Sequence, residues 1–75
     1  RFNRANALLA AGDPALASTL LREARRDAVD DLELRHAASY NLGIAAVAQA
    51  DAVLAADPSE ALVRLHEAAD WFREA

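Results

Sequence analysis

The sequence predicts an all-α domain built from two antiparallel helix pairs. Gly and Pro occur only twice each among 75 residues and Ala is abundant, a mixture that favours helix almost throughout. Two Asp-Pro dipeptides, at Asp13 and Asp57, each mark a helix start, because Asp caps a helix and Pro fits its first position. The segments that follow the two dipeptides match each other. We therefore expect one domain, with residues 1–29 as the first pair and residues 30–75 as the second.

The match between the two halves is an internal repeat. Residues 13–24, DPALASTLLREA, align with residues 57–68, DPSEALVRLHEA, at an offset of 44 (57 − 13). Residues 2–7, FNRANA, align with residues 40–45, YNLGIA, at an offset of 38 (40 − 2). The second copy therefore carries about six extra residues before Asp57. Helical repeats of this size stack side by side and commonly bind other proteins.

The first helix is expected over residues 2–11, and Gly12 suits the left-handed conformation that ends many helices. The second helix begins at Pro14, with Asp13 as its cap, and continues to about Ala28. Its last turns carry three cations that complement the negative end of the helix dipole: Arg22, Arg25 and Arg26.

The third helix is capped by Asp30 or Asp31 and meets no breaker before Pro58, so it is expected to run for about 25 residues. Its apolar residues recur at helical spacing and form a stripe: Ala37, Tyr40, Ile44, Val47 and Leu54. Asp51 interrupts this stripe and marks a place where the helix is expected to break.

The fourth helix begins at Pro58 and has an apolar and a polar side. The apolar side consists of Ala61, Leu65, Ala68 and Phe72, and the polar side of Arg64, Glu67, Asp70 and Glu74. Trp71 and Phe72 are adjacent and cannot share one helix face. We expect Phe72 to face inward and Trp71 to pack against a following repeat or the end of the third helix. The alternative is an exposed Trp71 that anchors a partner or oligomer interface.

Small residues indicate close helix packing. Gly43 and Ala61 are small residues on the third and fourth helices, and small side chains let two helix axes approach. Replacing either with Leu is expected to overpack the interface, at a cost of about 1–3 kcal/mol.

At these residues the chain resembles the tetratricopeptide repeat (TPR) family, over almost its whole length. The first helix of that family carries an aromatic or aliphatic residue and then Leu-Gly, as in Tyr40-Asn41-Leu42-Gly43. The second helix carries Ala, a large apolar residue and Ala, as in Ala17, Leu21 and Ala24, and again in Ala61, Leu65 and Ala68. Two departures are Ala5 in place of the glycine in the first copy and the insertion before Asp57. The resemblance implies part of a right-handed α-solenoid.

Residues 32–43, LELRHAASYNLG, are similar to a narrower group, the bacterial TPR proteins of aerotolerance-type operons that also encode von Willebrand factor A proteins. In that group a longer spacer can precede Asp-Pro, and a further repeat can follow a segment like residues 71–75. Because the chain opens at Arg1 and ends within a helical pattern, we expect it to be a fragment of a longer repeat array.

The TPR resemblance implies a partner-binding groove lined by the first helix of each pair. Its expected residues are Phe2, Asn6, Tyr40, Asn41, Ile44 and Val47. TPR proteins that grip a C-terminal carboxylate use Asn donors, and Asn3 and Asn41 align with that place. Such clamps also need a Lys where this chain has Phe2 or Tyr40, which puts a complete clamp in doubt. The alternative is that these Asn residues bond to the neighbouring helix or water, and that Tyr40 and Phe2 belong to the core.

The sequence gives little indication of nucleic-acid binding, membrane insertion, metal binding or catalysis. The net charge of −4 argues against nucleic-acid binding, and no segment is long and apolar enough for membrane insertion. His66 and Asp70 lack the second His of a zinc-protease helix and are expected to form an exposed pair, and His36 is expected at the surface. No phosphate loop or nucleophile motif is present, so neither catalysis nor a cofactor or metal is expected. Without Cys, cytoplasmic and periplasmic locations are both compatible.

The function expected from the sequence is a non-catalytic scaffold that binds a peptide or partner helix through the concave groove. The alternative is a self-association module, because two repeats bury their terminal faces poorly and the long third helix could exchange between chains to form a homo-oligomer.

Overall fold

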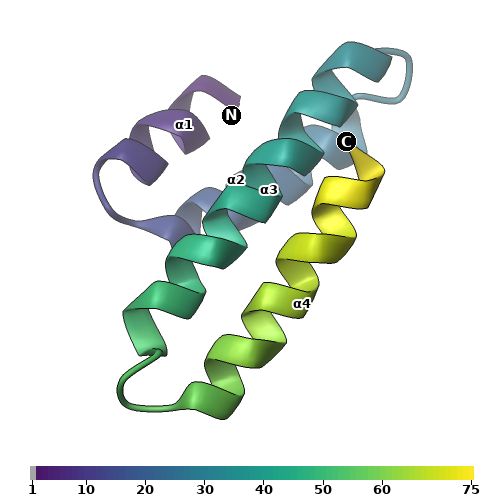
Figure 1. Ribbon diagram of the computed structural model, residues 1–75. Helices are drawn as coiled ribbons and strands as arrows, with labels where there is room; N and C mark the ends of the chain where they lie inside the picture. The colour runs from purple at the N-terminus through teal and green to yellow at the C-terminus, as the bar shows by residue number, and fades with distance from the viewer. Residues whose placement is uncertain (1) are drawn as a thin grey trace.

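The computed structural model describes residues 2–75, which form four helices and no strand. Their bounds are α1 Phe2–Ala10, α2 Pro14–Asp27, α3 Leu32–Val53 and α4 Pro58–Glu74. Each helix packs against the next along the chain, and α1 also touches α3 (Figure 1). The longest helix, α3, runs antiparallel to α4 and lies between α4 and the first pair (Figure 1). The all-α prediction is confirmed, with the helices in the expected order.

Helix starts depend on Asp, as the sequence predicted. The carboxylate of Asp13 accepts a hydrogen bond from the Leu16 backbone N–H at 3.3 Å, and Asp57 accepts one from Glu60 at 3.0 Å. Of the two candidates before α3, Asp31 is the cap, because it accepts from the Leu34 N–H at 3.0 Å. Gly12 ends the α1 region with φ +85°, the left-handed conformation that glycine adopts without steric cost.

The expected break at Asp51 is wrong. Helix α3 spans 22 residues and runs through Asp51, which is exposed, so its charge meets water instead of a packed neighbour. The helix ends at Val53, slightly earlier than expected. The Asp57 N–H then donates to the Val53 carbonyl at 2.7 Å and closes the turn into α4.

The core is made mostly of alanine. Among residues 2–75 the buried apolar residues are Leu21, Leu42 and ten alanines: Ala5, Ala17, Ala24, Ala28, Ala38, Ala45, Ala46, Ala50, Ala61 and Ala68. Leu21 and Leu42 meet Ala5 and Ala38 in one cluster, where the first pair packs against α3. Small side chains allow α3 to approach its neighbours closely, but they bury little apolar surface per residue.

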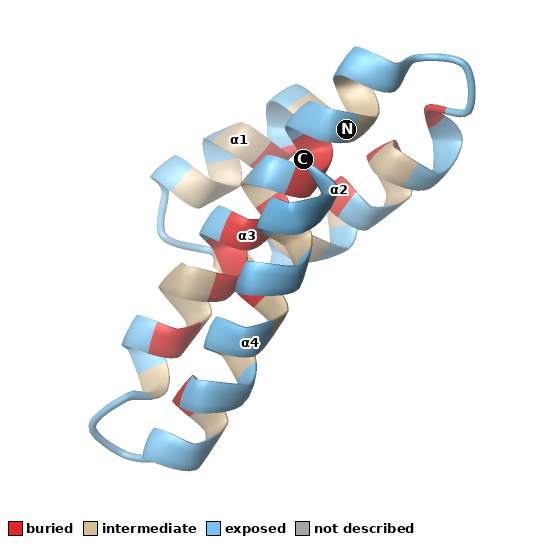
Figure 2. Ribbon diagram, turned by 45° about the vertical axis from the view of Figure 1, so that its right-hand side comes forward, coloured by how far each residue is buried: buried red, intermediate tan, exposed pale blue. Residues whose placement is uncertain are grey.

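The buried side of α3 is not its stripe of larger apolar residues. Ala37, Tyr40, Ile44 and Leu54 are exposed and Val47 is half-buried. The buried residues are Ala38, Ser39, Leu42, Gly43, Ala45, Ala46 and Ala50 (Figure 2). Because α3 has neighbours on several sides, close approach places small residues inward. The larger apolar residues are left at the surface.

Helix α4 packs through small residues too. Ala61 and Ala68 are buried, whereas Leu65 and Phe72, both expected in the interior, are partly exposed. The Phe72 ring lies over Gly43 and has its centroid 5.5 Å from that of Tyr40. Phe72 therefore faces α3 at the margin of the interface, not within a closed core.

Candidate interaction surfaces

Helix α4 has two different flanks beside the Ala61–Ala68 line that contacts α3. Residues three and four apart lie on one side of a helix, so each flank can be read from the sequence. The flank toward α2 carries Arg64, Glu67, Trp71 and Glu74. The other flank carries Leu62, Leu65, Ala69 and Phe72. One flank is thus polar with a single Trp, whereas these four residues of the other flank are all apolar.

The apolar flank continues onto α3. We define the open apolar face as Tyr40, Ile44 and Val47 of α3 with Leu62, Leu65 and Phe72 of α4. Five of these side chains are between 39% and 55% exposed, and Val47 is half-buried. Tyr40 meets Phe72, and the two helices are antiparallel (Figure 1). Ile44 and Val47 therefore lie one and two turns from Tyr40 along α3, in the direction in which Leu65 lies two turns from Phe72 along α4. Neighbouring apolar side chains that remain in water are typical of an interaction surface.

The polar flank borders a cleft of about 600 Å³ between α2 and α4. Trp71 is half-buried there and packs against the core cluster where the first pair meets α3. The guanidinium carbons of Arg22 and Arg25 lie 5.5 and 5.4 Å from its ring centroid, within the range of cation–π contacts. The expectation that Trp71 meets the end of α3 is therefore wrong. Its side chain faces α2, because it shares a flank with Arg64, Glu67 and Glu74.

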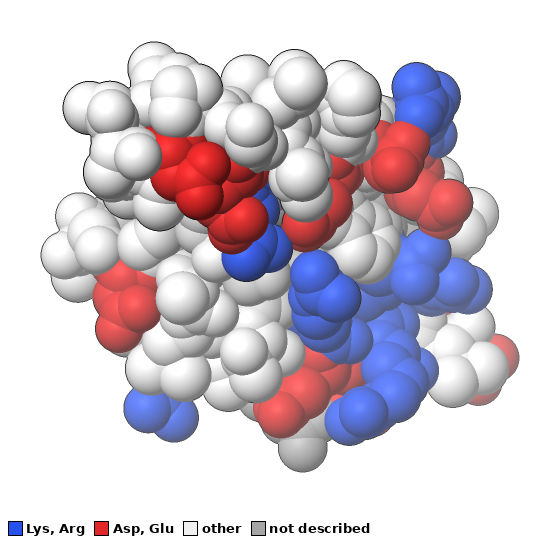
Figure 3. All heavy atoms as spheres, turned by 90° about the horizontal axis from the view of Figure 1, so that it is seen from below, with Lys and Arg blue, Asp and Glu red and all other residues white. Residues whose placement is uncertain are grey.

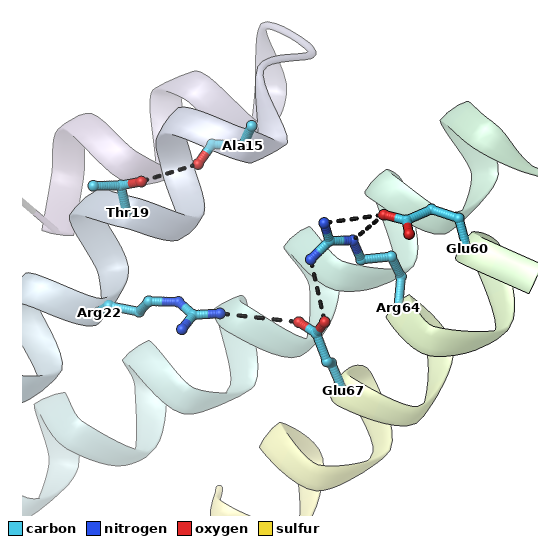
Figure 4. A network of polar contacts seen from close by, with 6 residues as sticks. All are labelled: Ala15, Thr19, Arg22, Glu60, Arg64 and Glu67. Carbon is cyan, nitrogen blue, oxygen red and sulfur yellow. Dashed lines mark hydrogen bonds and ion pairs between the residues drawn. The ribbon is translucent and has the colours of Figure 1, made fainter.

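Ion pairs cross this cleft and join the two helix pairs. Glu67 lies between Arg64, at 3.1 Å, and Arg22 of α2, at 3.9 Å (Figure 4). Arg64 also contacts Glu60 at 3.1 Å (Figure 4). Arg25 donates through Nη2 to Glu74 and through Nε to the buried Ser39 hydroxyl, both at 2.8 Å.

Opposite charges are interleaved over this part of the molecule. Figure 3 shows arginines grouped on part of one face with acidic side chains beside them. Asp70 pairs with Arg73, so the expected pair of Asp70 with His66 is not what the structure shows. The arginines of the cleft therefore serve first to link α2 and α4.

The two asparagines predicted for a carboxylate clamp, Asn3 and Asn41, lie in different surroundings. Asn41 donates from Nδ2 to the Asn6 side-chain oxygen at 2.7 Å, which joins α3 to α1. Asn3 is exposed and borders, with Phe2, a depression next to Ala28. The structure thus pairs Asn41 with Asn6 instead of Asn3. The bond to a neighbouring helix, weighed as an alternative from the sequence, describes Asn41.

From the sequence, Tyr40, Ile44 and Val47 were expected to line a groove, and the structure shows Tyr40 and Ile44 exposed and Val47 half-buried. Leu62 and Leu65 were not expected at the surface. A signal was available for Leu65. It aligns with Leu21, which the third helix covers, whereas nothing in the second pair plays that part for Leu65.

Within residues 2–75 no three His, Asp or Glu side chains come close enough together to hold a metal ion. In the same range no helix combines the length and the apolar character needed to cross a membrane. His36 is exposed, as expected.

The open apolar face is the feature on which function can be argued. The chain matches no family model, no curated protein and no solved structure.

Proposed function

We propose that this domain is a non-catalytic protein-interaction module that binds a partner helix across the open apolar face. The observation that carries the proposal is the exposure of Tyr40, Ile44, Leu65 and Phe72 on two packed helices, with Tyr40 in contact with Phe72. A partner helix would remove these side chains from water, and each Leu or Ile fully covered contributes about 1.5–3 kcal/mol. Two aromatic rings at one end supply the kind of anchor that dominates helix-in-groove recognition.

The small alanine core supports the same proposal. It leaves the larger apolar side chains of α3 and α4 outside the domain interior, where a partner can use them. Binding at this face would also stabilise the fold, because a ligand that binds only the native state shifts the unfolding equilibrium.

The test is selection of helical peptides from a displayed library with the wild-type domain as bait. We expect enriched sequences with apolar residues at helical spacing. Their binding should be lost with Leu65→Glu, which places a charge on the open apolar face. The matched control is Val63→Glu, an equally drastic change at an exposed residue of α4 that lies off the face, and binding should persist. A library that yields no binder, or binders indifferent to Leu65→Glu, would rule out the proposal.

Self-association is a second candidate, favoured by the same exposed side chains. Two copies could cover each other's open apolar face around a two-fold axis. Light scattering over a wide concentration range distinguishes the two, since a concentration-independent monomer excludes a dimer built on this face.

A further inference from the structure

The internal repeat shows what covers the corresponding face in the first helix pair. The correspondences at the two offsets are Phe2 with Tyr40, Asn6 with Ile44, Leu9 with Val47, Leu21 with Leu65 and Ala28 with Phe72. Every member of the open apolar face except Leu62 thus has an apolar or amide counterpart in the first pair. Leu62 corresponds to Ser18.

Helix α3 occupies that counterpart face. Leu21 is fully buried and clusters with Leu42 of α3, and Asn6 accepts the hydrogen bond from Asn41 of α3. Phe2 and Leu9 pack against the same cluster. Leu65, which corresponds to Leu21, is 43% exposed, because within residues 2–75 no helix lies on the second pair as α3 lies on the first.

The contact side of α3, meaning the side packed against the first pair, therefore shows what kind of helix would fit the open apolar face. It places Ala38 one turn before Leu42, so that a small residue allows close approach and Leu fills the space beside Leu21. A helix with the same small-then-Leu spacing would put its Leu against Leu65.

Two sequence differences between the copies change which side chains the open apolar face can accept. Ile44 occupies the position that corresponds to Asn6, which accepts the hydrogen bond from the Asn41 amide. A bound helix with an amide at the position equivalent to Asn41 would therefore bury that amide without a hydrogen-bond partner. Phe72 stands where Ala28 borders the depression that Leu34 also lines, so less space remains there for a Leu. The fitting helix should carry an apolar residue at the Asn41 register and a small residue at the Leu34 register.

The described helices of this chain do not supply such a contact side. That of α3 is already buried against the first pair. In α1 the corresponding residues at the offset of 38 are Asn3 for Asn41 and Arg4 for Leu42, and both are exposed. A second copy stacked head to tail would press the Arg4 guanidinium onto Leu65, which is unfavourable.

We infer that the open apolar face accepts a helix of a partner protein whose contact side repeats that of α3, with an apolar residue in place of Asn41 and a small one in place of Leu34. This inference rests on the proposed function and specifies its partner.

The probe is a fluorescently labelled peptide of residues 30–54, which contains α3, beside its Leu34→Ala/Asn41→Leu variant. Each is titrated with the intact domain and followed by anisotropy. We expect the variant peptide to bind about tenfold more tightly than the unmodified one, because its buried amide is gone. The domain variant Ile44→Asn should reverse this preference by supplying an acceptor and donor for Asn41. Leu65→Glu should abolish binding of both peptides, and Val63→Glu should leave it unchanged.

Equal affinities, tighter binding of the unmodified peptide, or binding that survives Leu65→Glu would overturn the inference. If neither peptide binds while library-selected helices do, only the partner specified here is wrong. If the library also yields nothing, the proposed function fails with it. A dimer that Leu65→Glu dissociates would replace the partner helix with a second copy.

Discussion

Replacing Gly43 with Ala should destabilise the domain, although Ala is the better helix former. Glycine in a helix interior is about 1 kcal/mol less favourable than alanine, so propensity alone predicts a gain. A Cβ at Gly43, however, would lie 2.6 Å from Cδ1 and 2.7 Å from Cζ of Phe72. Overpacking of this kind costs about 1–3 kcal/mol. Moving the ring also weakens its contact with Tyr40, worth about 0.5–1.5 kcal/mol.

The balance predicts a net loss of about 1 kcal/mol for Gly43→Ala in the wild-type domain. In a Phe72→Ala background the obstacle is absent, and the same substitution should stabilise by about 1 kcal/mol. The two positions should therefore couple by about 2 kcal/mol in a double-mutant cycle. The measurement is urea unfolding of the four proteins, followed by circular dichroism.

Gly12→Ala serves as the control for this cycle. No atom lies within 4 Å of a Cβ built there, but its φ of +85° makes any side chain unfavourable, at about 1 kcal/mol. That loss should be the same with and without Phe72. If Gly43→Ala changes stability equally in both backgrounds, the ring does not explain why glycine occupies this position.

Three further predictions concern a cap, an inter-pair contact and the α3–α4 interface. Asp31→Ala should cost about 1 kcal/mol and Asp30→Ala almost nothing, since only Asp31 caps α3; urea midpoints test the difference. Arg25→Ala should cost about 1–2 kcal/mol, because the buried Ser39 hydroxyl and Glu74 lose one donor together. Arg25→Lys should recover less than half of that loss, and full recovery would show that charge alone matters. Ala61→Leu should lower the free energy of unfolding by about 1–3 kcal/mol, whereas an unchanged midpoint would mean that α4 shifts freely on α3.

The helix positions could be read from the sequence because their signals are local. Asp-Pro at residues 13 and 57 and the glycine at residue 12 act within one turn of themselves, and the structure follows all three. The side of α3 that is buried could not be read in the same way. Hydrophobicity alone would bury the larger side chains such as Tyr40 and Ile44, but the closely packed neighbours of α3 cover its alanine side.

The exposure of the open apolar face was predictable in part. The TPR resemblance placed Tyr40 and Ile44 in the expected groove, and the structure shows both side chains exposed. The orientation of Trp71 depended on which flank of α4 faces α2, a relation between distant segments that no local pattern encodes. Aligning the two copies and asking which residues have a helix above them would have identified Leu65. The repeat thus holds more information about the site than periodicity does.

The position of Trp71 gives the domain a built-in optical reporter. It is the single tryptophan of the chain, and it lies between α2 and α4 beneath two guanidinium groups, on the flank of α4 away from the open apolar face. A ligand on that face does not touch the indole. A change in its emission on binding would therefore report a change in the angle between the two helix pairs, and constant emission would show that they move as one rigid body.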